Sequence, residues 1–138
     1  MTVQKIAREE VVTTSPRTSV RKIADQLREH GVGSVVVVED GAPVGIVTDR
    51  DIALQIWEAE DPTAATAADV MTTDLVTIAG DTDLYSALRQ ARKAGVRRLP
   101  VTEDGKLTGI MTLDDAIVLL AGELGEVSHI IQGHSPPY

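Results

Sequence analysis

The chain has 138 residues, which suits one compact domain, and it carries 13 lysine and arginine residues against 21 aspartate and glutamate residues. The resulting net charge of −8 and an aromatic content of only 2% disfavour nucleic-acid binding, which uses cations for the phosphates and rings for the bases. Cysteine is absent, and this excludes disulfides, thiolate metal sites and cysteine nucleophiles.

The first predicted elements are a short strand and an amphipathic helix. The strand covers Val11–Thr14. The helix follows from apolar residues at the spacing i, i+3, i+4 and i+7, namely Val20, Ile23, Ala24 and Leu27. Gly31 suits the left-handed conformation that often ends a helix. The valine run Val32–Val38 then predicts a strand that is buried on both faces.

A tight turn and a second strand come next. Asp40-Gly41 predicts a hairpin that leads into a strand at Pro43–Val47. Gly45 interrupts that strand, and a glycine in this position indicates close approach of another backbone or of a ligand. A second helix is expected near Asp49–Trp57, with its tryptophan as a packing residue, and a linker follows at Glu58–Thr66.

The second half of the chain repeats the first. Residues 75–118 align with residues 11–54 at an offset of 64 without a gap, and about a third of the paired positions are identical. A unit of this length is too long for a solenoid repeat and short for an independent domain. We therefore expect an α/β (α+β) fold of two β-α-β-β-α repeats, packed face to face with pseudo-twofold symmetry and two related clefts.

The repeat divides the chain into a first unit at residues 1–66, a second unit at residues 67–124 and a C-terminal tail at residues 125–138. In the second unit we expect a strand at Leu75–Ile78, a helix that ends at Gly95, strands at Val96–Thr102 and Lys106–Met111, and a helix at Leu113–Leu124. The tail contains Gly133, Pro136 and Pro137, so we expect it to be mobile at its end.

Each unit closes its last strand with a glycine, two apolar residues and a threonine, and an aspartate follows three residues later. The pairs are Thr48 with Asp51 and Thr112 with Asp115. A threonine at the start of a helix lies beside backbone N–H groups that attract anions, and a carboxylate can accept hydrogen bonds from two adjacent hydroxyls, as on a ribose. The same spacing describes a helix capping box, and capping can coexist with ligand binding.

Basic residues gather in one stretch of this acidic chain. Arg89, Arg92 and Lys93 fit the solvent-exposed face of a helix. Arg97 and Arg98 are expected at the entrance of a strand. Paired guanidinium groups in that position suit an anion, because guanidinium binds phosphate oxygens with two hydrogen bonds.

The repeated pattern resembles the cystathionine β-synthase (CBS) domain family. The resemblance rests on the threonine–aspartate motif present twice, with aligned helices, glycines and Asp-Gly turns, and it covers roughly residues 10–122. Two such domains in tandem resemble the family's regulatory unit, the Bateman module. The resemblance implies a regulatory ligand with an adenosyl group: AMP, ADP, ATP or S-adenosylmethionine. It also implies that the aspartates hold the ribose hydroxyls and that the threonines lie beside the phosphate.

Binding sites in this family combine residues of both repeats, so the resemblance implies two composite clefts. One would join Ile46, Thr48 and Asp51 to Val76, Val96 and Arg97. The other would join Ile110, Thr112 and Asp115 to Val12, Val32 and Gly33. Basic residues at the entrance of the second strand often contact phosphate in this family, and Arg97 and Arg98 match that place. The first repeat has Gly33 and Ser34 there instead, so we expect unequal clefts, with the one that lacks arginines weak or empty.

The favoured hypothesis is a tandem CBS protein that binds an adenine nucleotide and signals to an unidentified partner protein. The alternative is a constitutive dimeric scaffold with vestigial or S-adenosylmethionine-binding sites. A homodimer is expected from the crowded apolar residues of the last helix, which are Ile117, Val118, Leu119, Leu120 and Leu124.

Other functional classes find no support in the sequence. We expect no enzymatic activity, because no nucleophile and base stand at suggestive spacing, and no metal site, because the three histidines lack ligand spacing. The N-terminus lacks a signal-peptide core, and no apolar run approaches the roughly 20 residues of a membrane span. We therefore expect a cytoplasmic protein without membrane insertion.

Overall fold

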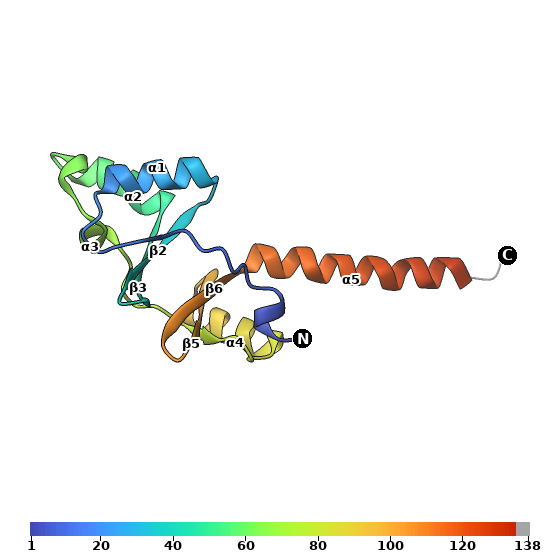
Figure 1. The fold of residues 1–138 in the computed structure, drawn as a ribbon. Coiled ribbons are helices and arrows are strands. Elements are labelled where there is room, and N and C mark those ends of the chain that lie inside the picture. The colour runs from blue at the N-terminus through green and yellow to red at the C-terminus, as the bar shows by residue number, and fades with distance from the viewer. Residues whose placement is uncertain (135–138) are drawn as a thin grey trace.

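The computed structural model describes residues 1–134, and it contains the expected β-α-β-β-α unit twice (Figure 1). The first repeat consists of β1 (Thr13–Thr14), α1 (Val20–His30), β2 (Ser34–Glu39), β3 (Ala42–Thr48) and α2 (Asp49–Glu58). The second consists of β4 (Ile78–Ala79), α4 (Leu84–Ala94), β5 (Arg98–Glu103), β6 (Lys106–Thr112) and α5 (Leu113–His134). Short helical turns lie at η1 (Val3–Lys5), η2 (Pro62–Ala64) and α3 (Ala67–Val70).

The two sheets have the same topology and the same register. Each has three strands, ordered β1-β2-β3 and β4-β5-β6, with the first pair parallel and the second antiparallel. Val36 pairs with Ile46, and Pro100 pairs with Ile110 at the offset of 64 that the sequence predicts. The sequence prediction of the repeat and of the fold class is confirmed.

Local sequence signals set the ends of the helices and the hairpins. Gly31 and Gly95 end α1 and α4 in the left-handed conformation, with φ of 62° and 68°. In each hairpin the aspartate and the glycine of the Asp-Gly turn both have positive φ, from 49° to 79°. This turn matches the twist of the flanking strands, so it fixes the hairpin register.

Each repeat has its own apolar core, and a third cluster joins them. Ile23 and Val47 belong to the core of the first repeat, and Leu99 and Met111 belong to that of the second. Between the repeats, Val36, Ile46 and Ile110 form a buried cluster. The strands β3 and β6 are therefore packed together along the pseudo-twofold axis, and the two clefts flank this contact.

Two connecting segments cross from one repeat to the other. Arg8 pairs with Ile110 on β6 through two backbone hydrogen bonds of 2.9 and 3.0 Å, and Thr72 pairs with Ile46 on β3 in the same way. The N-terminal segment also buries Val3 in the core of the second repeat. Thus the first ten residues, which the sequence division grouped with the first unit, pack against the second.

The last helix is longer than predicted, because α5 runs to His134 instead of ending near Leu124. Gly125 costs about 1 kcal/mol relative to alanine in a helix, but the good helix formers Glu123, Leu124 and Glu126 surround it, and the helix continues through Gly133. Figure 1 shows that α5 projects far beyond the two repeats. The expected mobility of the tail concerns residues 135–138, which lie outside the described residues.

Two methionines contribute to the cores of the repeats: Met111 is fully buried, and Met71 packs against the core of the first repeat. The prediction for Trp57 was wrong, because its side chain is 88% exposed near the end of α2. Within residues 1–134, no helix is both long enough and apolar enough to cross a bilayer.

Candidate functional site: two clefts between the repeats

Both threonine–aspartate motifs act as helix caps. The Thr48 hydroxyl accepts a hydrogen bond from the Asp51 N–H at 3.1 Å, and the Asp51 carboxylate accepts one from the Thr48 N–H at 2.8 Å. In the second repeat, the Asp115 N–H donates to the Thr112 hydroxyl at 3.1 Å, and this hydroxyl donates to Asp115 Oδ2 at 2.8 Å. Capping therefore fixes both pairs of side chains in place.

The start of α2 does not offer the free N–H donors that the sequence argument assumed. Its first three N–H groups already donate: Asp49 to the Gly33 carbonyl, Arg50 to the Asp49 carboxylate and Asp51 to the Thr48 hydroxyl. At the start of α5, Leu113 likewise donates to the Arg97 carbonyl. An anion in either cleft would therefore depend on side-chain cations more than on the helix terminus.

The first cleft lies on one side of the contact between β3 and β6. It has a volume of about 150 Å³. Its lining includes six of the predicted residues: Ile46, Thr48, Val76, Val96, Arg97 and Arg98. Asp51 does not line this cleft and lies behind Thr48, to which it is hydrogen-bonded.

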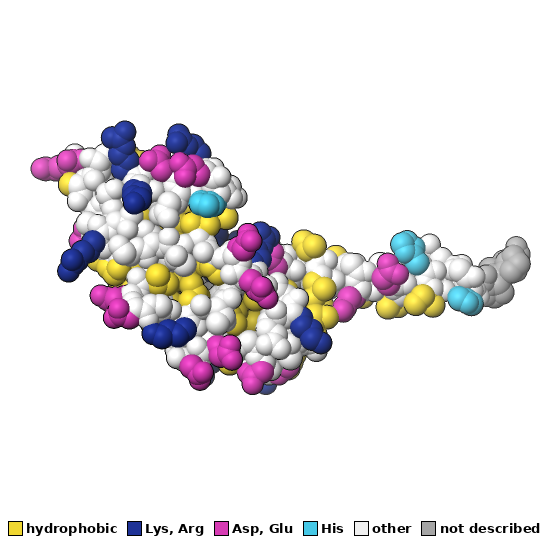
Figure 2. Space-filling view, in the orientation of Figure 1, with side chains coloured by type: hydrophobic (Ala, Val, Ile, Leu, Met, Phe, Trp, Pro, Cys, Tyr) yellow, Lys and Arg dark blue, Asp and Glu magenta, His cyan; other side chains and the backbone are white. Residues whose placement is uncertain are grey.

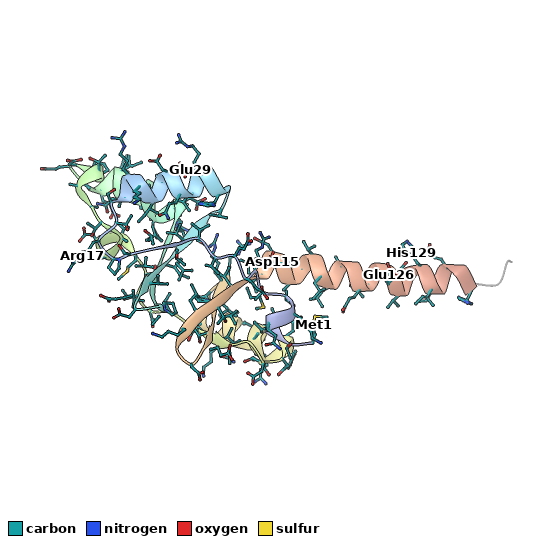
Figure 3. All side chains as sticks on the ribbon, viewed as in Figure 1. Met1, Arg17, Glu29, Asp115, Glu126 and His129 are labelled. Carbon is teal, nitrogen blue, oxygen red and sulfur yellow. The ribbon has the colours of Figure 1, made fainter. Side chains whose placement is uncertain are left out.

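The second cleft lies on the other side and is larger, with a volume of about 510 Å³. The first repeat contributes the predicted residues Val12, Val32, Gly33 and Ser34, and the second contributes Ile110 and Thr112. Asp115 is again held behind its threonine and is largely buried, with 14% of its side chain exposed. Figure 3 shows Asp115 at the base of α5, where the N-terminal segment passes.

The arginine pair is not confined to the first cleft, which corrects the sequence expectation. Arg97 and Arg98 line both clefts. Arg98 reaches across to the first repeat, where its Nη2 would lie 3.3 Å from a Cβ atom placed on Gly33. Gly33 therefore leaves the space that this guanidinium occupies. The first repeat has no arginine at this strand entrance, so the arginines of the second repeat supply the positive charge there.

Sequence reasoning missed a third arginine in the second cleft. Arg8 lines this cleft and donates from Nη2 to Asp115 Oδ1 at 2.7 Å and from Nε to the same oxygen at 3.1 Å. Burial opposes the ionisation of Asp115, but the hydrogen bonds from Arg8 and Thr112 outweigh it, so the pKa of Asp115 lies below its usual value. Arg8 precedes the aligned repeat, so only its charge could have drawn attention to it.

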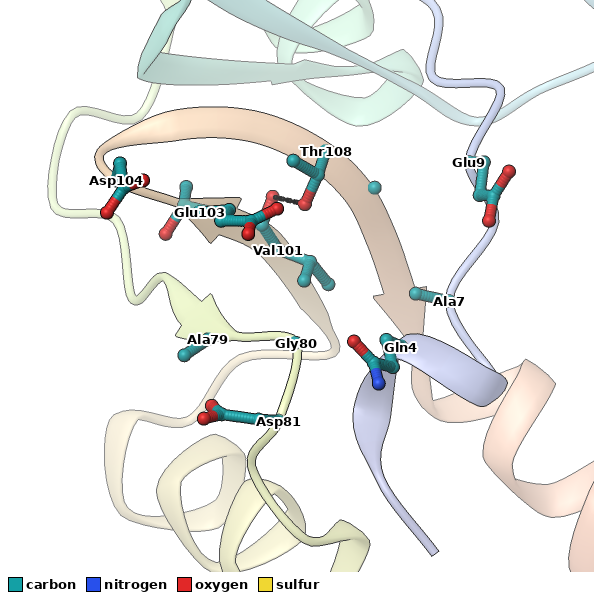
Figure 4. A pocket seen from close by; sticks show the side chains of 12 residues that line it. Gln4, Ala7, Glu9, Ala79, Gly80, Asp81, Val101, Glu103, Asp104 and Thr108 are labelled. Carbon is teal, nitrogen blue, oxygen red and sulfur yellow. Dashed lines mark hydrogen bonds between the residues drawn. The ribbon is translucent and has the colours of Figure 1, made fainter.

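A third hollow, of about 600 Å³, lies on the second repeat beside the N-terminal segment (Figure 4). Four carboxylates line it: Glu9, Asp81, Glu103 and Asp104. This lining disfavours an anionic ligand. Within the part of the chain that the structure describes, no group of three or more acidic or histidine side chains is arranged to hold a metal ion.

Comparison with known proteins shows where this architecture recurs. The CBS domain pattern matches residues 3–58 and again residues 67–122. The chain is 38% identical over 120 residues to an uncharacterised protein of Methanopyrus kandleri, covering 85% of this chain and 61% of that protein. It is 34% identical over 109 residues to the CBS domain-containing protein YhcV of Bacillus subtilis, covering 79% of this chain and 78% of YhcV.

Solved structures agree with this match. An uncharacterised conserved protein from Pyrococcus horikoshii is 28% identical and superimposes with a TM-score of 0.76. The alignment covers 86% of this chain and 90% of that one. The CBS domain pair of protein MJ0100 was solved in complex with 5′-methylthioadenosine and S-adenosyl-L-methionine. It is 25% identical and superimposes with a TM-score of 0.80, and the alignment covers 89% of this chain and 98% of that one. The chain spans less than two thirds of the M. kandleri relative. With two matched domains, two matching sheets and two composite clefts, this chain belongs to the CBS domain family and carries the domain as a tandem pair.

Proposed function

We propose that this protein is a regulatory CBS pair that binds an adenine nucleotide, AMP, ADP or ATP, in the second cleft. The observation that carries this proposal is the composition of the cleft. Val12 and Val32 give it an apolar wall on the first repeat, and Thr112 and the carboxylate behind it lie on the second. An apolar slot and a ribose acceptor are what an adenosyl group requires.

The charge and the size of the second cleft support the same assignment. Arg8, Arg97 and Arg98 line it, against the carboxylates of Glu10 and Asp114. Arg97 is 3.5 Å from Asp114, and both side chains are mostly exposed, so this weak ion pair leaves the guanidinium available to a phosphate. The volume of about 510 Å³ lies within the usual range for small-molecule sites, roughly 300–1,000 Å³, whereas the first cleft is smaller than that.

A ligand in this cleft would touch both repeats at once. Such a ligand stabilises the arrangement of the repeats that it fits, and it can shift only an equilibrium between arrangements that bind it differently. We infer that this shift is the signal read by a partner protein. The adenosyl compounds bound to the MJ0100 domain pair support the ligand class, since that pair has the same fold.

Isothermal titration of the protein with AMP, ADP, ATP and S-adenosylmethionine tests the proposal. We expect saturable binding by the wild type and a loss of at least about tenfold in affinity for Asp115→Ala, because the ribose hydroxyls lose a charged acceptor. Asp51→Ala is the matched control, since it alters the equivalent cap in the smaller cleft. Folded protein that produces no heat with millimolar ligand would refute the proposal.

A homodimer is favoured by the exposed face of α5. Ile117, Leu120, Leu124, Val127 and Ile131 follow one another at alternating steps of three and four residues, and each is at least 39% exposed. This spacing is the heptad pattern of a helix that packs against another helix. Hydrophobic side chains line the projecting part of α5 in Figure 2. Leu119, by contrast, packs against the core of its own repeat.

We infer that a second copy of the chain covers this apolar face of α5. Light scattering at micromolar concentration checks this, and a monomer would contradict it. A dimer that binds no adenosyl ligand would favour the scaffold function over the sensor.

A further inference from the structure

The N-terminal segment places an arginine on the carboxylate that would bind the ribose. Arg8 contacts Asp115 Oδ1 at 2.7 and 3.1 Å and Oδ2 at 3.3 Å. The Arg8 side chain is 67% exposed, whereas the Asp115 side chain is 14% exposed. The exposed arginine therefore lies on the solvent side of a largely buried carboxylate.

This contact is not required by the fold. Thr72 occupies the equivalent position beside β3, with the same pair of backbone hydrogen bonds to Ile46 that Arg8 makes to Ile110. Among the described residues, no cationic side chain is paired with Asp51, the equivalent carboxylate. Since the repeat without the arginine folds in the same way, the ion pair is a property of the second cleft rather than of the CBS unit.

We propose that Arg8 makes the second cleft selective for adenine nucleotides that carry phosphate over adenosyl ligands that lack it. This inference rests on the proposed function. A ribose that binds Asp115 through both hydroxyls must displace Arg8, because the guanidinium and Thr112 already occupy both carboxylate oxygens.

The displaced guanidinium then needs a new partner. A phosphate supplies one, because Arg8 lines the same cleft as Arg97 and Arg98, and charge-assisted hydrogen bonds to an anion replace those lost to the carboxylate. A neutral ligand such as 5′-methylthioadenosine supplies no anion in exchange for the lost carboxylate contact.

The experiment compares two ligands on two proteins by isothermal titration. AMP and 5′-methylthioadenosine share the adenosine group, and AMP alone carries phosphate. Because the Arg8 side chain is mostly exposed, solvent screens this ion pair, and we take its effect on an affinity as about fivefold. We therefore expect Arg8→Ala to bind 5′-methylthioadenosine about fivefold more tightly than the wild type. The affinity for AMP should stay nearly the same, because the variant loses both the phosphate contact and the cost of displacing Arg8, so the preference for AMP falls by about fivefold.

Controls separate charge from folding. Arg21→Ala removes a cation from the exposed face of α1, away from the cleft, and should leave both affinities unchanged. Arg8→Gln removes the charge but keeps most of the side-chain length. It should show the affinities expected for Arg8→Ala, and it replaces that variant in the test if the alanine variant folds poorly.

The outcomes also separate this inference from the proposed function. If neither the wild type nor the variants bind any adenosyl ligand, the proposed function fails. If they bind, but both variants keep the wild-type ratio of the two affinities, or bind 5′-methylthioadenosine more weakly, Arg8 does not select for phosphate and this inference alone is overturned.

Discussion

The strand glycine of the second repeat, Gly109, gives the sharpest test of how the N-terminal segment is held. A Cβ atom at this position would lie 2.9 Å from the backbone oxygen of Arg8. That oxygen accepts a hydrogen bond from the Ile110 N–H at 3.0 Å, and the Arg8 N–H donates to the Ile110 carbonyl at 2.9 Å. Because the obstacle is backbone, Gly109→Ala must push the segment outward and break or stretch both hydrogen bonds.

Two backbone hydrogen bonds contribute about 0.5–1.5 kcal/mol each, so we expect Gly109→Ala to lower the free energy of unfolding by about 1–3 kcal/mol. Urea unfolding followed by circular dichroism measures this change, provided that the transition is two-state. Gly122→Ala is the matched control. The Cβ that it adds to α5 meets no other side chain or segment within 4 Å, so helix propensity predicts a gain of up to about 1 kcal/mol.

The equivalent change in the first repeat provides a second comparison. An alanine at Gly45 would overlap the side chain of Met71, whose sulfur would lie nearest the new Cβ. A flexible side chain can move where a backbone cannot, so Gly45→Ala should cost less than Gly109→Ala. Stability of Gly109→Ala equal to that of the wild type would refute the claim that the N-terminal segment packs closely against β6.

Two further predictions concern acid stability and assembly. Because the pKa of Asp115 is lowered in the folded state, its ion pair with Arg8 stabilises the protein fully above the unfolded pKa, about 4, and this contribution disappears as pH falls through the lower folded pKa. The difference in unfolding free energy between the wild type and Asp115→Asn should therefore shrink below about pH 4 in urea titrations, and a difference that stays constant down to pH 2.5 would contradict this assignment. Leu124→Glu should convert the expected dimer to a monomer in light scattering. Val118→Glu is the control, because Val118 is as exposed as Leu124 but lies outside the heptad positions, and this variant should remain a dimer. A dimer that survives Leu124→Glu would place the interface elsewhere.

The repeated unit could be predicted from the sequence because its determinants are local. Gly31 and Gly95 end helices, Asp-Gly turns set hairpins, and the valines of β2 mark a buried strand. Each of these signals acts within a few residues, and each appears twice at a fixed offset. A glycine inside a strand predicts close approach of another backbone or of a ligand. At Gly109 the backbone of Arg8 does approach closely, whereas at Gly45 the close neighbour is the side chain of Met71.

The charge distribution of the clefts could not be predicted in this way, because it depends on contacts between distant segments. Arg8 and Asp115 are 107 residues apart, and their pairing depends on the N-terminal segment crossing to the second repeat. The sequence predicts arginines at the first cleft only, because the strand entrance that faces the second cleft carries Gly33 and Ser34. Its side chain instead passes Gly33 and lines both clefts.

These two departures from symmetry have one physical origin. At the entrance of the second strand, the first repeat has Gly33 and Ser34 and the second repeat has Arg97 and Arg98. The segment paired with β3 places Thr72 there, whereas the segment paired with β6 places Arg8 in the equivalent position. Every one of these differences keeps the backbone pairing intact and changes the size and the charge of a side chain that faces a cleft. The fold therefore tolerates them without loss, and they are the positions at which two copies of one unit can acquire different ligand preferences.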